Sequence, residues 1–279
     1  MSQVNNNFAA FILSHGRPNN VITYDKLIQH GYTGKIYIVI DNEDNTADEY
    51  YKNFGKENVI MFDKEQVAKQ FDEIDNFGNR KTIVYARNVC FDIAKKLGIK
   101  NFIQLDDDYY WFGHRTKDGA KTTRSLDKIF HALTEFVNNT PITSVCFSQG
   151  GDHIGGFDEN KKIRRKAMNS FVCSTEKPFK FIGRINEDVT TYTRLGGLGK
   201  VFLTINNIQL DQKDTQTNKG GMTDVYLLSG TYLKSFYSVI VNPSCVKVKT
   251  ITAKHTRMHH HIKWDNAVAC IIDEKHKKK

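Results

Sequence analysis

Long hydrophobic runs are missing from this sequence. Its uninterrupted apolar stretches, such as residues 36–40, fall far short of the roughly 18 residues that cross a bilayer. The opening residues Met1, Ser2 and Gln3 do not begin the basic and then apolar pattern of a secretory signal. These two absences exclude a membrane-spanning or signal-secreted protein and predict a cytoplasmic one that does not enter membranes.

The sequence also lacks a cysteine framework. Its five cysteines are an odd number, stand far apart and include no C-x-x-C pair, which argues against a disulfide scaffold or a zinc ribbon. We expect reduced, mostly buried thiols. The five are Cys90, Cys146, Cys173, Cys245 and Cys270.

No Pro- or Ser-rich linker and no internal repeat divides the chain. Its 279 residues, 39% of them hydrophobic and 25% charged, have the composition of an ordinary globular protein. We therefore expect one domain over residues 1–279, with two halves that share one cleft.

Charge is distributed unevenly along the chain. The sequence has 40 Lys and Arg residues against 31 Asp and Glu, a formal charge of +9. Residues 41–75 hold 11 acidic and 4 basic side chains, whereas residues 161–184 hold eight basic side chains and a single acid, Glu176. Such a basic segment suits a polyanion such as nucleic acid, because bound Lys and Arg displace counterions from phosphates. A solvated face, with a frayed basic tail at residues 275–279, explains the same residues.

The first half alternates strand-like and helix-like segments. Strands are expected at residues 8–13, 35–40, 58–62 and 101–105. Helices are expected from Pro18 to about residue 30, at residues 47–54 behind a Thr46–Glu49 capping box, and at residues 82–97 before Gly98. This alternation predicts an α/β fold with a mostly parallel, Rossmann-like central sheet flanked by helices, whose ligands bind beyond the carboxyl ends of the strands.

The second half is less regular. We expect a helix at residues 126–138, a strand at 142–147, strands at 201–203 and 205–210, a polar loop at 211–221 and a helix at 223–234. Residues 149–168 are glycine-dense and then basic, which favours a long loop that serves as a lid or a substrate platform.

An acidic triplet follows the fourth expected strand. Asp106, Asp107 and Asp108 stand directly after an apolar run, and alternate carboxylates at a strand end can point the same way. Together they are suited to a hard divalent cation that also holds a diphosphate, and their mutual repulsion calls for such a counterion. An acidic turn that caps the next element is the other interpretation.

The motifs around this triplet resemble a known group of enzymes. A helix opening Tyr85-Ala86-Arg87-Asn88, a short strand and then Leu105-Asp106-Asp107-Asp108 is similar to the nucleotide-sugar half of A-type glycosyltransferases, particularly the inverting family-two group. This resemblance implies that a UDP-sugar and Mn²⁺ or Mg²⁺ bind here. It places Asp41 near the base, Asp106 near the ribose or the metal and Asp108 on the metal. The implied nucleotide-binding residues are Ser14, His15, Arg17, Asp41, Arg87, Asn88, Asp106 and Asp107.

The same resemblance continues in Asn186-Glu187-Asp188. It implies catalytic carboxylates at Glu187 and Asp188, with Asp188 as the base that deprotonates the acceptor hydroxyl in a single inverting displacement. These residues also have the pattern of a helix N-cap followed by first-turn acids, and the two interpretations are compatible.

Histidines crowd near the end of the chain. His255, His259, His260 and His261 lie within seven residues, and a C-terminal histidine often completes the metal shell of the enzymes that this chain resembles. His260 is the candidate third metal ligand beside Asp106 and Asp108. A solvated or phosphate-contacting turn is the alternative.

The ordered set of motifs resembles the TET/JBP-associated glycosyltransferases over most of residues 8–265. Its members are the segments 11–18, 31–35, 41–44, 105–109 and 184–188. This resemblance implies an acceptor in double-stranded DNA, the hydroxymethyl group of a modified pyrimidine, with 5-hydroxymethylcytosine favoured. A base inside a duplex must be flipped out or reached in distorted DNA, and Phe157, His153 or Tyr192 could stack on it. The expected DNA-binding residues are Lys161, Lys162, Arg164, Arg165 and Lys166.

Three hypotheses therefore stand beside one another. The first is a metal-dependent DNA-base glycosyltransferase, with a nucleotide-sugar half at residues 1–112, an acceptor half at 113–265 and a basic tail at 266–279. The second is a glycosyltransferase that modifies a polysaccharide or a protein. The third is a non-catalytic nucleic-acid-binding module, which leaves the acidic triplet without a purpose.

Overall fold

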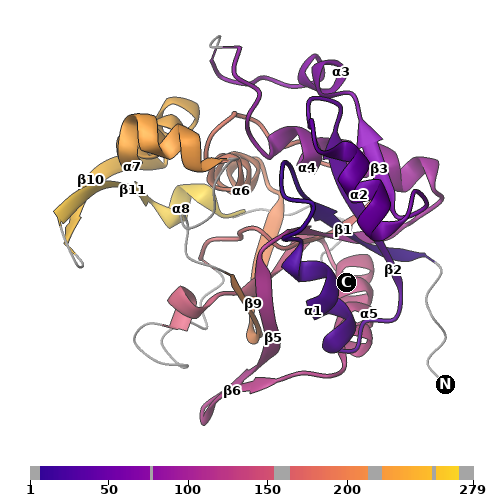
Figure 1. Cartoon of the computed structure of the whole chain (residues 1–279). Helices are drawn as coiled ribbons and strands as arrows, with labels where there is room; N and C mark the ends of the chain where they lie inside the picture. Colours follow the sequence, from indigo (N-terminus) through magenta and orange to yellow (C-terminus); the bar gives the residue numbers. More distant parts are fainter. Residues whose placement is uncertain (1–6, 76–77, 154–163, 213–221, 253–255, 270–279) are drawn as a thin grey trace.

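The computed structural model describes residues 7–75, 78–153, 164–212, 222–252 and 256–269 (Figure 1). The strands are β1 (Phe8–Leu13), β2 (Lys35–Asp41), β3 (Val59–Phe62), β4 (Asn101–Asp106), β5 (Tyr109–Thr116), β6 (Gly119–Thr122), β7 (Ile142–Ser148), β8 (Phe171–Ser174), β9 (Val201–Gln212), β10 (Val246–Thr252) and β11 (Thr256–Ile262). The helices are α1 (Ile22–Gln29), α2 (Ala47–Phe54), α3 (Lys64–Ala68), α4 (Val84–Lys96), α5 (Leu126–Asn139), α6 (Glu187–Gly197), α7 (Met222–Val241) and α8 (Trp264–Ala267), with a 3₁₀ turn at Gly150–His153.

One nine-stranded sheet joins both halves of the chain. Its strand order is β3-β2-β1-β4-β8-β7-β9-β5-β6. The strands β1 to β4 pair in parallel, as do β7 and β9, while β5 and β8 run against their neighbours. The α/β fold with a mostly parallel central sheet is confirmed.

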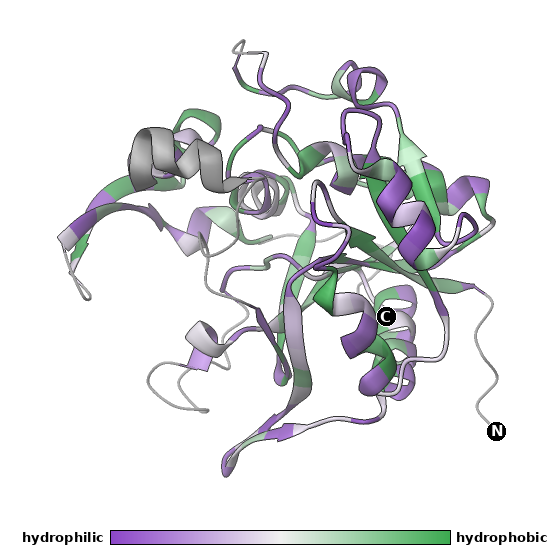
Figure 2. Cartoon of the chain, in the orientation of Figure 1, coloured by the Kyte–Doolittle hydropathy of each residue, from purple (hydrophilic) through white to green (hydrophobic). Residues whose placement is uncertain are grey.

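Helices cover both faces of this sheet. In β1 the side chains of Ala9, Phe11 and Leu13 join a core shared with α4 and α6. The alternate residues Phe8, Ala10 and Ile12 join a second core shared with α1, α2 and α5. Because both faces are buried, the strand is apolar throughout rather than alternating. Figure 2 shows the same layering, with hydrophobic strands inside and hydrophilic residues on the outer helix surfaces.

A second, smaller unit packs against α6. The strands β10 and β11 form an antiparallel hairpin that contacts α7, and α6 contacts both α7 and α8 (Figure 1). The approach of α6 to α8 requires a glycine, because a Cβ atom on Gly196 would lie 2.0 Å from the carbonyl oxygen of Ala267. Among the described helices, none combines the length and hydrophobicity that a membrane crossing requires.

Several expected boundaries were wrong. The first helix begins at Ile22 rather than Pro18, because Arg17 to Asn20 form a turn that the Asn20 amide closes on the Arg17 carbonyl. The second helix begins where expected, but without a capping box, since the Thr46 hydroxyl donates to Asp44 at 2.6 Å.

In the second half of the chain, the structure differs more from the expected elements. The two strands expected at 201–210 are one strand, β9, whose register against β7 shifts beyond Ile205. The helix α7 is longer than expected and ends at Val241. Half of the expected loop at 149–168 and most of the expected loop at 211–221 lie outside the described residues. The antiparallel strands β5, β6, β8, β10 and β11 were not predicted.

The turn after α1 yields a prediction about stability. Gly31 has a φ of +82°, and a Cβ atom there would lie 2.3 Å from the carbonyl oxygen of Arg124. Gly98 has a similar φ of +68° but open space around it. Gly98→Ala should cost only the left-handed backbone penalty of about 1–2 kcal/mol. Gly31→Ala should cost distinctly more, because the Arg124 backbone must also move. Urea denaturation of both variants measures the difference, and equal losses would contradict this account.

Candidate active site at the carboxyl edge of the sheet

The carboxyl ends of three neighbouring parallel strands bring the expected polar residues to one edge. β1 leads into Ser14, β2 ends at Asp41, and β4 ends at Asp106. The direct pairing of β1 with both β2 and β4 places these ends next to one another. This is the edge at which parallel α/β sheets bind ligands.

The carboxylate of Asp107 is bound by other side chains of the protein. Its carboxylate accepts a hydrogen bond from the Ser14 hydroxyl at 2.6 Å and forms an ion pair with Arg17 at 3.0 Å. Burial raises the pKa of Asp107, although Arg17 and Ser14 oppose the rise. Tyr50 completes the arrangement, because its hydroxyl is bonded to Ser14 and accepts from the Arg17 backbone amide. Asp107 was expected at the nucleotide, and in the structure its carboxylate fixes the turn after β1.

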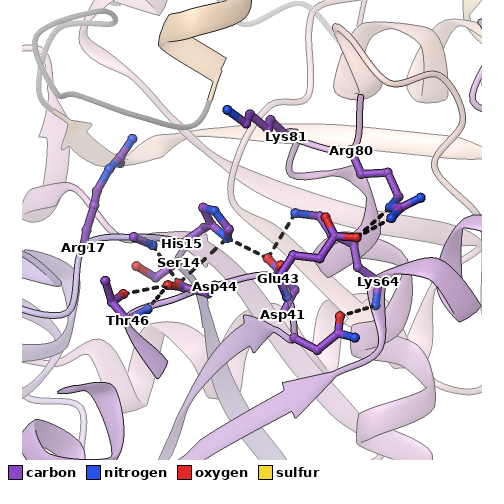
Figure 3. A network of polar contacts seen from close by, with 12 residues as sticks. Ser14, His15, Arg17, Asp41, Glu43, Asp44, Thr46, Lys64, Arg80 and Lys81 are labelled. Atoms are coloured by element: carbon purple, nitrogen blue, oxygen red, sulfur yellow. Dashed lines mark hydrogen bonds and ion pairs between the residues drawn. The ribbon is translucent and has the colours of Figure 1, made fainter. Parts of the chain in front are cut away.

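Asp41 lies at the centre of a polar network (Figure 3). Its carboxylate is 2.9 Å from His15 Nδ1 and 3.2 Å from Lys64 Nζ. Burial works to raise the pKa of Asp41, but the hydrogen bond from His15 and the charge of Lys64 outweigh it, so the pKa is lowered. Asp44 accepts from the Gly16 backbone amide at 2.7 Å and so draws the β1 turn towards β2.

Sequence reasoning missed Lys64, whose side chain is only 4% exposed. The signal was present, because Asp63 and Lys64 follow the third strand directly and therefore lie at the same sheet edge. It also missed the pair of Arg80 with Glu43, which closes the other side of the network at 2.6 Å.

Arg87 of α4 joins the two expected carboxylate motifs. Its Nη2 lies 3.0 Å from Asp106, and its Nε lies 2.8 Å from Glu187. The side chain is 1% exposed and lies between the rings of Phe171 and Phe181. Burial opposes its charge, but the two carboxylates outweigh burial and raise the pKa of Arg87. A surface helix position is excluded for this residue.

The carboxylates at the end of β4 have raised pKa values. Burial raises the pKa of Asp106 to about 6, against the opposing charge of Arg87. Burial and then the charges of Asp106 and Asp107 raise the pKa of Asp108 to about 7. Carboxylates that resist ionisation together fit a divalent cation, which would supply the missing charge.

The first turn of α6 holds Glu187 and Asp188, both buried. Asn186 precedes them with a left-handed φ of +58°, and its amide donates to Ser238 of α7 at 2.5 Å. Asp188 accepts from the Val189 amide at 2.7 Å. Burial raises the pKa of Glu187 despite Arg87. The expected helix start is confirmed, although the Asn186 side chain bonds α7 rather than the helix.

His260 lies on β11, opposite Val248. Burial, followed by the positive neighbours His259, Lys234 and Lys166, lowers the pKa of His260 to about 3, so the imidazole is neutral, as a metal ligand must be. Its Nδ1 is buried without a hydrogen-bond partner. Within the described ranges, however, no three His, Cys, Asp or Glu side chains lie close enough to hold one metal ion.

Other expected residues have structural contacts instead. Both ends of the Asn88 amide bond the Phe181 backbone, which explains its burial away from a ligand. Tyr192 is 3% exposed and stacks on Trp264, and His153 is buried against Ser148, so neither is available to a flipped base. Phe157 lies outside the described residues.

The basic segment is not one continuous surface. Arg165 and Lys166 both pair with Asp152, at 3.0 and 3.2 Å, and Arg164 pairs with Asp265. Further along, Arg184 forms a buried pair with Asp75. Only 10% of the Arg165 side chain is exposed, so Arg165 offers little surface to a partner in this arrangement. Lys161 and Lys162 lie outside the described residues.

Together, the parallel sheet, the acidic end of β4 and the buried carboxylates of α6 form one candidate active site on an α/β fold. The family model described as TET-Associated Glycosyltransferase matches residues 8–221. This match spans most of the chain, so the protein belongs to that family and is a glycosyltransferase. Among curated proteins, none matches the chain.

Solved structures with similar folds have low identity. Glucosyl-3-phosphoglycerate synthase from Mycobacterium tuberculosis, in complex with Mg²⁺ and UDP, is 11% identical with a TM-score of 0.44, and the match covers 91% of this chain and 87% of that one. Mannosyltransferase PcManGT from Pyrobaculum calidifontis, in complex with GDP-Man and Mn²⁺, is 10% identical with a TM-score of 0.46, covering 77% and 58%. Residues 1–349 of S. aureus TarS, in complex with UDP-GlcNAc, are 9% identical with a TM-score of 0.46, covering 79% and 64%.

The raised pKa values predict how the stability of the metal-free protein depends on pH. The folded pKa values of about 6 for Asp106 and about 7 for Asp108 exceed the ordinary aspartate value of about 4. Between these values the folded state binds more protons than the unfolded state, so the free energy of unfolding falls as the pH rises and the fall ends above about pH 7. Melting temperatures in chelator at about pH 5 and pH 8 test this.

Asp108→Asn should flatten that fall, because it removes one of the titrating groups. Comparing it with the wild type cancels the histidines that titrate in the same range. At about pH 8, Mn²⁺ should raise the melting temperature of the wild type by a few degrees and leave the melting temperature of Asp108→Asn unchanged. The same melting curve for both proteins would contradict the assigned titration.

Arg87 and Arg80 allow a matched comparison of ion pairs. Arg87→Met should cost about 3–5 kcal/mol, because it leaves Asp106 and Glu187 buried without their counterion. Arg80→Met removes a pair in which both side chains are about one-third exposed, and it should cost less than about 1 kcal/mol. Chemical denaturation measures both losses, and a small loss for Arg87→Met would show that water replaces its guanidinium.

Proposed function

We propose that this protein transfers a sugar from a UDP-sugar to the hydroxymethyl group of a modified pyrimidine in double-stranded DNA, with 5-hydroxymethylcytosine favoured. The transfer is a single displacement that inverts the anomeric centre. Residues 1–112 bind the donor and residues 113–265 bind the acceptor.

One observation carries this proposal. The guanidinium of Arg87 holds Asp106, at the donor edge of the sheet, and Glu187, at the start of α6, at 3.0 and 2.8 Å. It thereby fixes the distance between the expected donor site and the expected base. A displacement reaction depends on such positioning, because small misplacements of the reacting groups cost large factors in rate.

The residues of the sheet edge have separate roles in this proposal. Asp41, held by His15 and Lys64, faces the nucleotide base, and the turn from Ser14 to Arg17 borders the nucleotide. Asp106 and Asp108 would hold Mn²⁺ or Mg²⁺, and His260 is the proposed third ligand, although the described arrangement does not bring these three side chains together. A bound divalent cation would supply positive charge to the diphosphate that leaves with the nucleotide.

Asp188 takes the acceptor proton in this mechanism. One of its oxygens accepts from the Val189 amide, which fixes the carboxylate at the start of α6. Glu187 holds Arg87 and so orients the same turn. The family match supports a DNA-base acceptor through the association of this family with hydroxymethylated pyrimidines.

The test is a transfer assay with DNA that carries either 5-hydroxymethylcytosine or cytosine, Mn²⁺ and a panel of UDP-sugars. Digestion to nucleosides and mass spectrometry should detect a hexose, pentose or acetylhexosamine only on the hydroxymethylated base. Metal-dependent UDP release without a DNA adduct would assign the acceptor to a polysaccharide, a protein or another base.

Asp188→Asn should lower this transfer by at least about 100-fold, because the acceptor hydroxyl loses its base. Asp108→Asn should also lower the rate of transfer, because it removes a proposed metal ligand. The matched control is Asp118→Asn, in the exposed turn between β5 and β6, which should keep full activity. Transfer by Asp188→Asn at the control rate would exclude Asp188 as the base.

A further inference from the structure

The β10–β11 hairpin has one strongly basic face. Directly opposed residues of an antiparallel pair project from the same side of the ribbon. The register opposes Lys247 to His261, Lys249 to His259, and Ile251 to Arg257. Five of these six side chains are basic or are imidazoles, and four of the five are exposed, with His259 half-buried.

Nothing acidic in the surrounding sequence balances this face. The chain has no Asp or Glu between Asp224 and Asp265. Within the described residues, Lys247, Lys249 and Arg257 form no ion pair. This distinguishes the hairpin from the segment that was expected to bind DNA, where Arg165 and Lys166 are held by Asp152.

The opposite face of the hairpin is anchored to the protein. Val246 and its partner Ile262 are 1% and 8% exposed and belong to the core that contains α6. The Ser235 hydroxyl of α7 donates to the Met258 carbonyl at 3.3 Å. The base of the ribbon is therefore fixed to the protein by this face, whereas Thr250, Thr252 and Thr256 of the same face are exposed towards the tip.

The elements that support the hairpin also contact α6, whose first turn holds the proposed base Asp188. Ser238 of α7 accepts from Asn186, the residue before α6, and Asn242, just after α7, donates to Thr193 of α6 at 2.7 Å. Trp264, just after β11, stacks on Tyr192 of α6. The hairpin and the start of α6, where the proposed base Asp188 lies, are thus both attached to α7.

We propose that the outer face of the β10–β11 hairpin is the surface that binds the backbone of the acceptor DNA. Lys247, Lys249 and Arg257 contact phosphates, while His259 and His261 add hydrogen-bond donors. This inference rests on the proposed function and adds to it the place where the duplex lies. The hairpin follows residue 221, where the family match ends, so that match does not cover it.

The shape of the hairpin supports double-stranded DNA as the partner. A two-stranded antiparallel ribbon fits the major groove of B-form DNA, whose walls are lined by phosphates. Each strand has seven residues, which is about 24 Å of extended chain. A basic ribbon of this length can therefore contact both walls of a groove about 12 Å wide.

The experiment measures binding of unmodified duplex DNA by fluorescence anisotropy over a range of salt concentrations. The variant is K247A/K249A/R257A. The control, K52A/K56A/K128A, removes the same charge from exposed positions on and near α2 and on α5. Each phosphate contact contributes about 0.9 to the slope of log affinity against log salt, so the hairpin variant should lose about 2–3 from the slope and the control should lose little.

The outcomes separate the inference from the function on which it rests. If the wild type fails to bind duplex DNA at low salt, the DNA acceptor and this inference both fail. If the wild type binds and both variants bind equally well, only the hairpin assignment fails. A hairpin variant that keeps DNA binding but loses binding to phosphatidylserine vesicles would assign the face to membranes and overturn the inference. Equal melting temperatures of the two variants show that lost binding is not lost folding.

Discussion

The buried guanidinium of Arg87 forms the ion pairs on which the arrangement of the candidate active site depends. It is the point at which α4, the end of β4 and the start of α6 meet. A charge removed from water in this way is tolerated only when its partners are charged and well placed. The geometry of the site is therefore held by electrostatics within the core, and not by the loops that surround it.

This dependence explains why acidic residues can gather at one strand end in a folded protein. Asp106 and Glu187 share Arg87, and Asp107 has Arg17, while burial and the neighbouring carboxylates raise the pKa of Asp108 to about 7. The Asp41 network differs, because His15 and Lys64 already lower the pKa of its carboxylate.

The parallel half of the fold and the strand-end residues could be predicted from the sequence, because apolar strands, helix periodicity and acidic strand ends are local signals. The short antiparallel strands could not, because β8 and β6 are four residues long and depend on distant partners. The partners of Arg165 and Lys166 were equally hidden, since Asp152 lies in a glycine-rich stretch that gave no sign of pairing. Charge along the sequence was therefore a poor guide to charge on the surface. The basic face of the hairpin arises only from cross-strand register.

The outward positions of the hairpin have an evolutionary consequence. Their side chains are largely exposed, while the fold is held by the opposite face through Val246 and Ile262. Substitutions at exposed positions of this kind usually change stability by less than about 0.5 kcal/mol. The outer face can therefore change in sequence without disturbing the carboxylates at the sheet edge.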